Sequence, residues 1–178
     1  MNEKRFLIAV DLQKDFIDGS LGTAEAQAIV PAAAARVRAA REAGETVIAT
    51  LDTHESNYME TREGRKLPVP HCIRGTEGWR LDPAVEAALG DSPRVEKPTF
   101  GSVRLPELVC ELAGGADRLS IELIGLCTDI CVVSNALLLK ASFPEADIAV
   151  RADCCAGVTP EKHAAALETM ASCQIDIL

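Results

Sequence analysis

Residues 5–10, Arg5-Phe-Leu-Ile-Ala-Val10, form an apolar run that ends directly at Asp11. A run of this length without polar alternation is typical of a strand that is covered on both faces of a sheet. The same pattern recurs along the chain, and each recurrence predicts a further strand. The five further runs are residues 45–51 before Asp52, 93–96 before Lys97, 119–124 before Gly125, 146–150 before Arg151, and 174–178.

Helical patterns separate these runs. Apolar residues at helical spacing and the helix-start pairs Asp82-Pro83 and Thr159-Pro160 predict helices over residues 31–43, 83–89, 105–112, a stretch after Thr128, and 160–172. Alternation of strand and helix predicts the α/β class, with a three-layer α/β/α architecture around a doubly wound, mostly parallel six-stranded sheet. With 178 residues, one such domain accounts for residues 1–178.

Charge and composition narrow the classes of partner. The 27 acidic residues exceed the 18 basic ones and give a net charge of −9, which repels nucleic-acid phosphates and anionic lipids. No apolar stretch approaches the ~18 residues of a spanning helix, and the polar start does not resemble a signal peptide, so we expect a cytoplasmic protein. An odd number of cysteines, seven, in such a chain predicts free thiols.

Reactive side chains follow the predicted strands. Ligands of open α/β sheets bind outside the carboxyl ends of the strands. Asp11, Asp52, Lys97 and the turn at residues 125–131 all fall at such ends, so we expect them to converge. Two segments, residues 12–23 and 53–80, interrupt the alternation, and long loops in compact domains are usually functional.

The turn Gly125-Leu-Cys-Thr-Asp-Ile-Cys131 leads from a strand into a helix that Thr128 is expected to cap. That cap places Cys131 in the first helical turn, where free amides lower the pKa of a thiol. We therefore predict Cys131 as a nucleophile, with the backbone amides of Cys127 and Cys131 as an oxyanion hole. Asp11 as the base and Lys97 as the cation would complete the requirements for acyl transfer.

The long loop contains two of the three histidines. Asp52, His54 and His71, with Glu63, form an oxygen and nitrogen set suited to zinc, with iron or manganese as alternatives. In the other interpretation, the histidines only hydrogen-bond the loop to the sheet and Glu63 is a surface charge.

Aromatic residues are scarce, at 3% of the chain, yet four of them lie on these loops: Phe16, Tyr58, Trp79 and Phe100. Flat apolar walls beside a nucleophile suit a flat, ring-bearing substrate. We therefore predict Phe16, Trp79 and Phe100 as substrate-binding residues.

These segments together resemble a known family. Residues 10–16 (VDLQKDF), 52–54 (DTH), 71–79 (HCIRGTEGW), 97–100 (KPTF) and 125–131 (GLCTDIC) are similar, in this order, to the isochorismatase-like cysteine hydrolases, and among them most similar to the nicotinamidases. The chain departs from the nicotinamidase pattern after Asp52. Nicotinamidases usually have Trp-His-Pro there and a further histidine a few residues on, whereas this chain has Thr53-His54-Glu55 and Tyr58.

The resemblance implies a metal-dependent amidase that converts nicotinamide to nicotinic acid and ammonia in NAD salvage. It implies a triad of Asp11, Lys97 and Cys131, a thioester on Cys131, and a cis peptide bond near Leu126-Cys127. It also implies a parallel six-stranded sheet, homo-oligomers, and a metal that anchors the pyridine nitrogen. Two alternatives stay open: a metal-independent hydrolase of carbamoyl or other small amides, and a non-catalytic thiol or metal-binding protein that uses Cys127 and Cys131.

Overall fold

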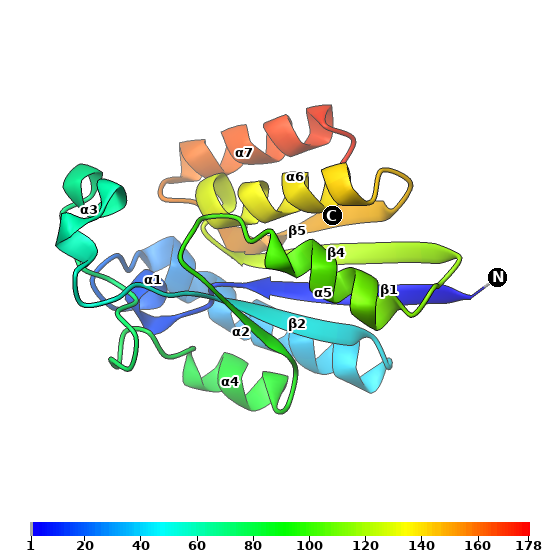
Figure 1. Cartoon of the computed structure of the whole chain (residues 1–178), viewed down its shortest axis with the longest axis horizontal. Helices are drawn as coiled ribbons and strands as arrows, with labels where there is room; N and C mark the ends of the chain where they lie inside the picture. The colour runs from blue at the N-terminus through cyan, green and yellow to red at the C-terminus, as the bar shows by residue number, and fades with distance from the viewer. Residues whose placement is uncertain (1) are drawn as a thin grey trace.

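The computed structural model of the chain describes residues 2–178 and contains one six-stranded sheet (Figure 1). All neighbouring strands pair in parallel, in the order β3-β2-β1-β4-β5-β6. The sheet confirms the predicted strand number and direction. The strands are β1 (Glu3–Val10), β2 (Thr46–Asp52), β3 (Arg94–Lys97), β4 (Arg118–Leu126), β5 (Asp147–Ala156) and β6 (Asp176–Ile177).

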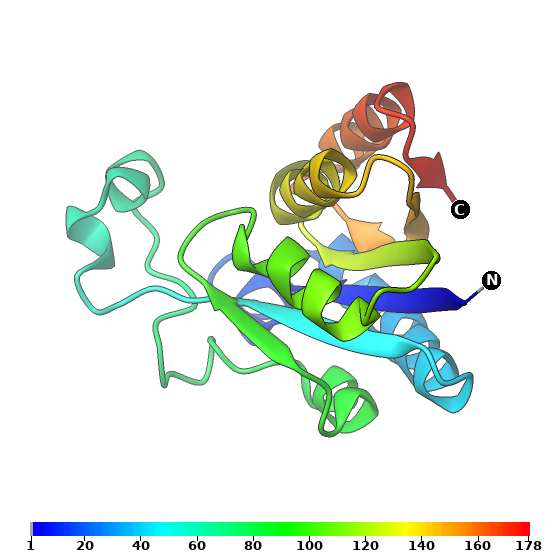
Figure 2. The ribbon, with the colours of Figure 1, turned by 45° about the vertical axis from the view of Figure 1, so that its right-hand side comes forward.

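Helices cover both faces of the sheet, which confirms the three-layer α/β/α class (Figures 1 and 2). Successive side chains of a strand point to opposite faces, and β1 shows this division clearly. Leu7 and Ala9 pack with the helices of one layer, whereas Phe6 and Ile8 pack with those of the other. The first layer holds α2 (Ala24–Glu42) and α4 (Pro83–Leu89), and the second holds α5 (Arg104–Ala113), α6 (Val133–Ser142) and α7 (Pro160–Ser172).

Some element boundaries differ from the prediction. Helix α2 begins at Ala24 rather than near Pro31, because the Thr23 hydroxyl accepts a hydrogen bond from the amide of Ala26 at 3.0 Å and caps the helix there. The predicted caps Asp82 and Thr159 are confirmed by hydrogen bonds from the first-turn amides of α4 and α7. Strand β5 continues past Val150 to Ala156.

The two interrupting segments lie beyond the carboxyl ends of the strands. The first contains α1 (Lys14–Ile17), and the second contains a short 3₁₀ turn (Tyr58–Glu60) and α3 (Arg62–Lys66). Figure 2 shows α3 standing out from the body of the molecule, and we call residues 55–70 the arm. In the described part of the chain, no helix has the length and hydrophobicity needed to cross a membrane.

A close approach between two central strands sets the position of the turn after β4. Gly125 pairs with Val10 across β4 and β1, and a Cβ atom at Gly125 would lie 2.0 Å from the carbonyl oxygen of Val10. The φ of Gly125 is +121°, a region that favours glycine. This glycine therefore allows residues 126–131 to start directly beside Asp11.

Candidate active site

The structure brings Asp11, Lys97 and Cys131 together, although they come from three separate segments of the chain. Asp11 follows β1, Lys97 ends β3, and Cys131 lies in the turn after β4. Lys97 Nζ is 2.6 Å from Asp11 Oδ2 and 3.4 Å from Cys131 Sγ. All three residues are buried, with at most 4% of each exposed. Buried charges occur in proteins when they are paired, and this pair adjoins a thiol.

The charges in this group favour Asp11 as a proton acceptor for the Cys131 thiol. Burial raises the pKa of Asp11, although the ammonium of Lys97 opposes the increase. The hydroxyl of Thr50 donates to Asp11 Oδ1 at 2.6 Å and fixes the carboxylate. Burial lowers the pKa of Lys97, but Asp11, Cys131 and Asp52 outweigh it and raise the pKa above the usual lysine value. Lys97 therefore stays charged, and Asp11 is a stronger base than an exposed carboxylate.

Cys131 differs from its prediction in one respect. Burial and the neighbouring Asp11 raise the pKa of its thiol well above the ordinary value, against the opposing effect of Lys97. The expected lowering at a helix start is therefore wrong, because the site is almost fully buried. The resting residue is a thiol, so its reaction requires a base, and Asp11 lies beside it.

The turn that carries Cys131 is not an ordinary first helical turn. Residues Thr128–Val132 form a π-helical turn, in which the amide of Val132 donates to the carbonyl of Cys127 at 3.1 Å. The amide of Ile130 donates to the same carbonyl at 3.0 Å, so the Cys127 carbonyl engages the amides on either side of Cys131 and not that of Cys131 itself. The N-cap of this turn is Cys127 rather than Thr128, so the predicted cap is wrong.

The peptide bond between Leu126 and Cys127 is cis, as the resemblance implied. Cys127 is partly exposed and lines the same cavity as Cys131. All seven cysteines are free, which confirms the prediction of thiols.

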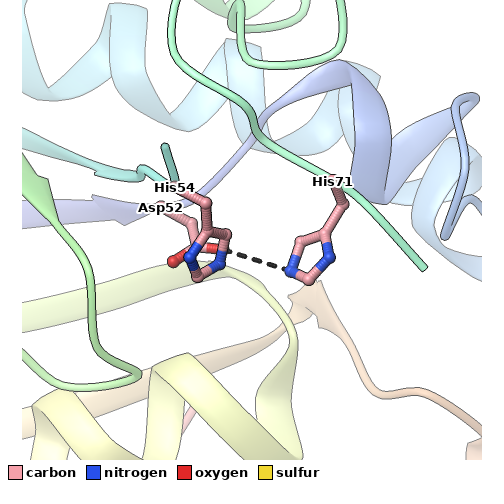
Figure 3. A group of neighbouring side chains, drawn as sticks. All are labelled: Asp52, His54 and His71. Atoms are coloured by element: carbon pink, nitrogen blue, oxygen red, sulfur yellow. Dashed lines mark ion pairs between the residues drawn. The ribbon is translucent and has the colours of Figure 1, made fainter. Parts of the chain in front are cut away.

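Asp52, His54 and His71 form a compact group of donor atoms beside this centre (Figure 3). One ligand atom from each residue lies within 4.8 Å of the other two, and Asp52 Oδ2 is 3.1 Å from His54 Nε2 and 3.5 Å from His71 Nε2. Burial would raise the pKa of Asp52, but the two imidazoles and Lys97 lower it below the usual range. Asp52 also lies 3.6 Å from Lys97 Nζ through its other oxygen, so the two groups of residues adjoin.

The imidazoles are arranged as metal ligands commonly are. His71 Nδ1 donates to the carbonyl of Val69 at 2.8 Å, because a carbonyl only accepts, and this bond leaves Nε2 with a free lone pair. His54 Nε2 is buried, and its approach to Asp52 Oδ2 lacks hydrogen-bond geometry, so this nitrogen has no hydrogen-bond partner among residues 2–178. An unsatisfied buried nitrogen that faces a carboxylate and a second imidazole fits a divalent cation.

The arm contributes a fourth donor atom, an oxygen, and an aromatic wall to this group. Glu63 Oε1 lies 3.7 Å from the Nε2 atoms of both His54 and His71. Tyr58 is buried with its ring centroid 4.7 Å from that of His54 and 5.0 Å from that of His71. Its hydroxyl donates to the carbonyl of Leu67, which ties the two ends of the arm together.

A cavity of about 290 Å³ opens onto both groups. Phe16 and Phe100 line it, together with Asp52, Glu63, His71, Cys127 and Cys131. Further lining residues that sequence analysis did not identify are Leu21, Thr23, Leu67, Ile130, Val158 and Lys162. The sequence carries a partial signal for these residues, because each lies on a segment that follows a predicted strand or in the first turn of the helix after it. The lining is mainly apolar and includes a few polar or reactive side chains, among them Cys131, which is typical of a small-molecule site.

Trp79 does not line this cavity, in contrast to Phe16 and Phe100, with which it was predicted to bind the substrate. Its indole nitrogen donates to the hydroxyl of Thr53 at 2.9 Å, and the ring lines a separate surface depression. Its carbonyl accepts from the side chain of Gln13, which also bonds the backbone of Asp52 in both directions. Trp79 and Gln13 therefore support the loop that follows Asp52. Gln13 was not identified from the sequence, although it lies in the segment 10–16.

Asp15 fastens the loop that carries His71. Its carboxylate accepts from the amide of Cys72 at 2.8 Å, and a Cβ atom at Gly78 would lie 2.1 Å from the same oxygen. The neighbouring Phe16 packs on His71 with a centroid separation of 5.6 Å. Helix α1 thus positions both a cavity wall and a candidate ligand.

The family model described as the isochorismatase domain matches residues 5–178. This chain belongs to the isochorismatase family. Its sequence is 25% identical to that of the nicotinamidase/pyrazinamidase of Mycobacterium tuberculosis, over 98% of both chains. The nicotinamidase/pyrazinamidase PncA of Bacillus subtilis superposes with a TM-score of 0.84 at 26% identity, over 98% of both chains. The pyrazinamidase of Pyrococcus horikoshii, solved in complex with zinc, superposes with a TM-score of 0.79 at 28% identity, over 98% of both chains.

Proposed function

We propose that this protein is a metal-dependent cysteine amidase that hydrolyses nicotinamide, or a closely similar ring amide, to the carboxylic acid and ammonia. The observation that carries the proposal is the buried group behind Cys131, which lines the cavity: Lys97 Nζ lies 2.6 Å from Asp11 and 3.4 Å from Cys131. A base, a fixed cation and a sulfur nucleophile in mutual contact are the requirements of nucleophilic acyl transfer. The reaction would serve NAD salvage in the cytoplasm.

The prediction that the chain is a hydrolase of amide bonds is confirmed by its family and by its nicotinamidase relatives. Similarity to ring-amide hydrolases and the apolar walls from Phe16 and Phe100 support the finer choice of a flat ring. A volume of about 290 Å³ is close to the lower end of the ~300–1,000 Å³ of ligand sites, which suits one small ring.

The first half of the reaction uses this chain's own residues. Asp11 accepts the proton of the Cys131 thiol, and Sγ forms a bond to the amide carbon. The amides of Cys127 and Cys131 donate to the oxyanion that develops on the carbonyl oxygen. The carbon–nitrogen bond then breaks, Asp11 returns the proton to the leaving nitrogen, and ammonia departs from a thioester on Cys131.

The second half reverses these roles. Asp11 accepts a proton from water, and the water oxygen forms a bond to the thioester carbon. The carbon–sulfur bond breaks, the acid is released, and the sulfur recovers its proton from Asp11. Lys97 remains charged throughout and stabilises the carboxylate and the developing thiolate in turn.

The residues that would hold the metal are Asp52, His54 and His71, with Glu63 as a fourth ligand from the arm. Two imidazoles and carboxylate oxygens suit zinc, and iron or manganese share this preference. A bound ion would supply a Lewis acid for a ring nitrogen of the substrate. Tyr58 and Val69 orient the imidazoles for this role.

The function is tested by release of ammonia from a panel of amides with zinc-loaded protein. We expect nicotinamide and pyrazinamide to be hydrolysed, and a linear carbamoyl amide to react at least about tenfold more slowly because it lacks the ring. Full activity after removal of the metal would instead support the metal-independent hydrolase. If no amide releases ammonia, the proposal is refuted, and the non-catalytic thiol or metal-binding protein is the alternative that remains.

Metal binding has its own test, which needs no turnover. We expect His54→Ala and His71→Ala to lose zinc affinity by more than the ~10–100-fold typical of changes around a metal ligand, because each removes a donor atom. Zinc content after dialysis and titration calorimetry measure this loss. His163→Leu, which removes the histidine outside the group, is the matched control and should retain zinc. Equal zinc content in the three variants would contradict the proposed ligands.

A further inference from the structure

The third histidine, His163, has no place in the chemistry described so far. It lies in the first turn of α7, is partly buried, and lines neither the catalytic cavity nor the metal group. Its Nδ1 lies 2.8 Å from Oγ1 of Thr128, a hydrogen bond between side chains 35 residues apart. Burial lowers the pKa of His163, which keeps the ring neutral near pH 7.

Thr128 connects this histidine to the reactive turn. Thr128 is fully buried and opens the π-helical turn that carries Cys131. The N-cap of this turn is Cys127, so Thr128 is its first residue and the Thr128 hydroxyl does not act as the helix cap. His163 is its hydrogen-bond partner instead. This hydrogen bond therefore fixes the orientation of the turn against α7.

A second contact joins the same two segments. Asp129 Oδ1 accepts from the amide of Val158 at 2.9 Å. A Cβ atom at Gly157 would lie 2.7 Å from the amide nitrogen of His163 and 2.9 Å from Asp129 Oδ1, so the backbone of the β5–α7 loop packs closely against the turn. Two hydrogen bonds and a close approach therefore hold residues 128–129 against residues 157–163.

We propose that His163 is a positioning residue of the reaction, which acts through Thr128 to hold the amides of Cys127 and Cys131 where the oxyanion forms. This inference rests on the proposed amidase function. Donors that stabilise an oxyanion act only when they are held in place before the reaction, and a displacement of about 1 Å can cost roughly 10²-fold in rate. His163 touches no substrate and is not a catalytic residue.

The test compares variants that remove the hydrogen bond with variants that keep it. His163→Leu and Thr128→Val remove one partner each, whereas His163→Asn and Thr128→Ser retain a polar atom near the same position. We expect the first two to lower kcat by roughly 10- to 100-fold with little change in KM, because the loss falls on the transition state. The conservative pair should recover most of kcat. The double variant should be no worse than either single variant, since both remove one interaction.

Two further measurements separate positioning from general damage. Alkylation of Cys131 by iodoacetamide forms no oxyanion, so its rate should be unchanged in His163→Leu, and zinc affinity should also be unchanged. Glu168→Ala, on the exposed side of α7, is the matched control for the helix.

The outcomes distinguish this inference from the proposed function. If the wild-type protein releases no ammonia, the proposed function fails and this inference fails with it. If the wild type is active and His163→Leu keeps its kcat, only this inference is overturned. It is likewise overturned if alkylation falls in parallel with kcat, or if His163→Asn is as impaired as His163→Leu, because either result indicates a merely structural role.

Discussion

The Cys131→Ala variant is expected to lose roughly 10⁴-fold or more of kcat/KM for amide hydrolysis and to keep its fold. The sulfur is the atom that bonds the amide carbon in the proposed mechanism, and no other described thiol lies beside the Lys97 ammonium. The side chain is nearly buried, and alanine removes only the sulfur, so we expect a modest loss of stability of about 1 kcal/mol. Ammonia release and urea denaturation measure the two effects.

Two cysteine variants serve as controls for this prediction. Cys155→Ala removes a thiol that is equally buried against the same helix layer but has no cation beside it. Cys127→Ala removes the other thiol that lines the cavity, while its backbone amide remains. Both should retain most of the activity. A Cys127→Ala loss as large as that of Cys131→Ala would contradict the assignment of the nucleophile and favour the thiol-binding alternative.

The Asp11→Asn variant should move two measurements in opposite directions. Hydrolysis should fall by about 10³-fold, because the amide side chain accepts no proton from the thiol. Alkylation of Cys131 near neutral pH should become faster. Asp11 raises the pKa of the thiol and Lys97 lowers it, so removing the carboxylate charge leaves Lys97 to stabilise the thiolate.

The pH dependence of iodoacetamide alkylation measures this shift directly. We expect the midpoint of thiol ionisation to move to lower pH in Asp11→Asn and to higher pH in Lys97→Met, because the two variants remove opposite charges. Slower alkylation of Asp11→Asn at pH 7 would contradict the proposed contact between the carboxylate and the thiol. Unchanged hydrolysis in that variant would exclude Asp11 as the proton acceptor.

The sheet and the convergence of the strand ends were predictable from the sequence. Asp11 and Asp52 each follow an apolar run, and such a run predicts a buried strand. Lys97 follows a weaker strand pattern, in which exposed and buried residues alternate. Once the strands are parallel, their carboxyl ends share one edge, so these three residues had to approach one another. The close pairing of Val10 with Gly125 then placed Cys131 in the same group.

Other features of the site depend on partners that no local pattern reveals. The role of Thr128 is set by His163 on α7, and a cap prediction considers only the residues that follow. The pKa of Cys131 depends on burial by both strands and helices, whereas its position in the turn suggested the opposite shift. Trp79 lies on a loop as expected, but its hydrogen bond to Thr53 directs it away from the cavity.

The arm separates what the protein recognises from what keeps it folded. Glu63 and Leu67 lie in residues 55–70, which project beyond the sheet and add little to either layer of the core. Natural selection can therefore lengthen or exchange this segment without disturbing the strands that align the nucleophile. Diversity in ligand preference among relatives with the same central sheet would be the evolutionary outcome.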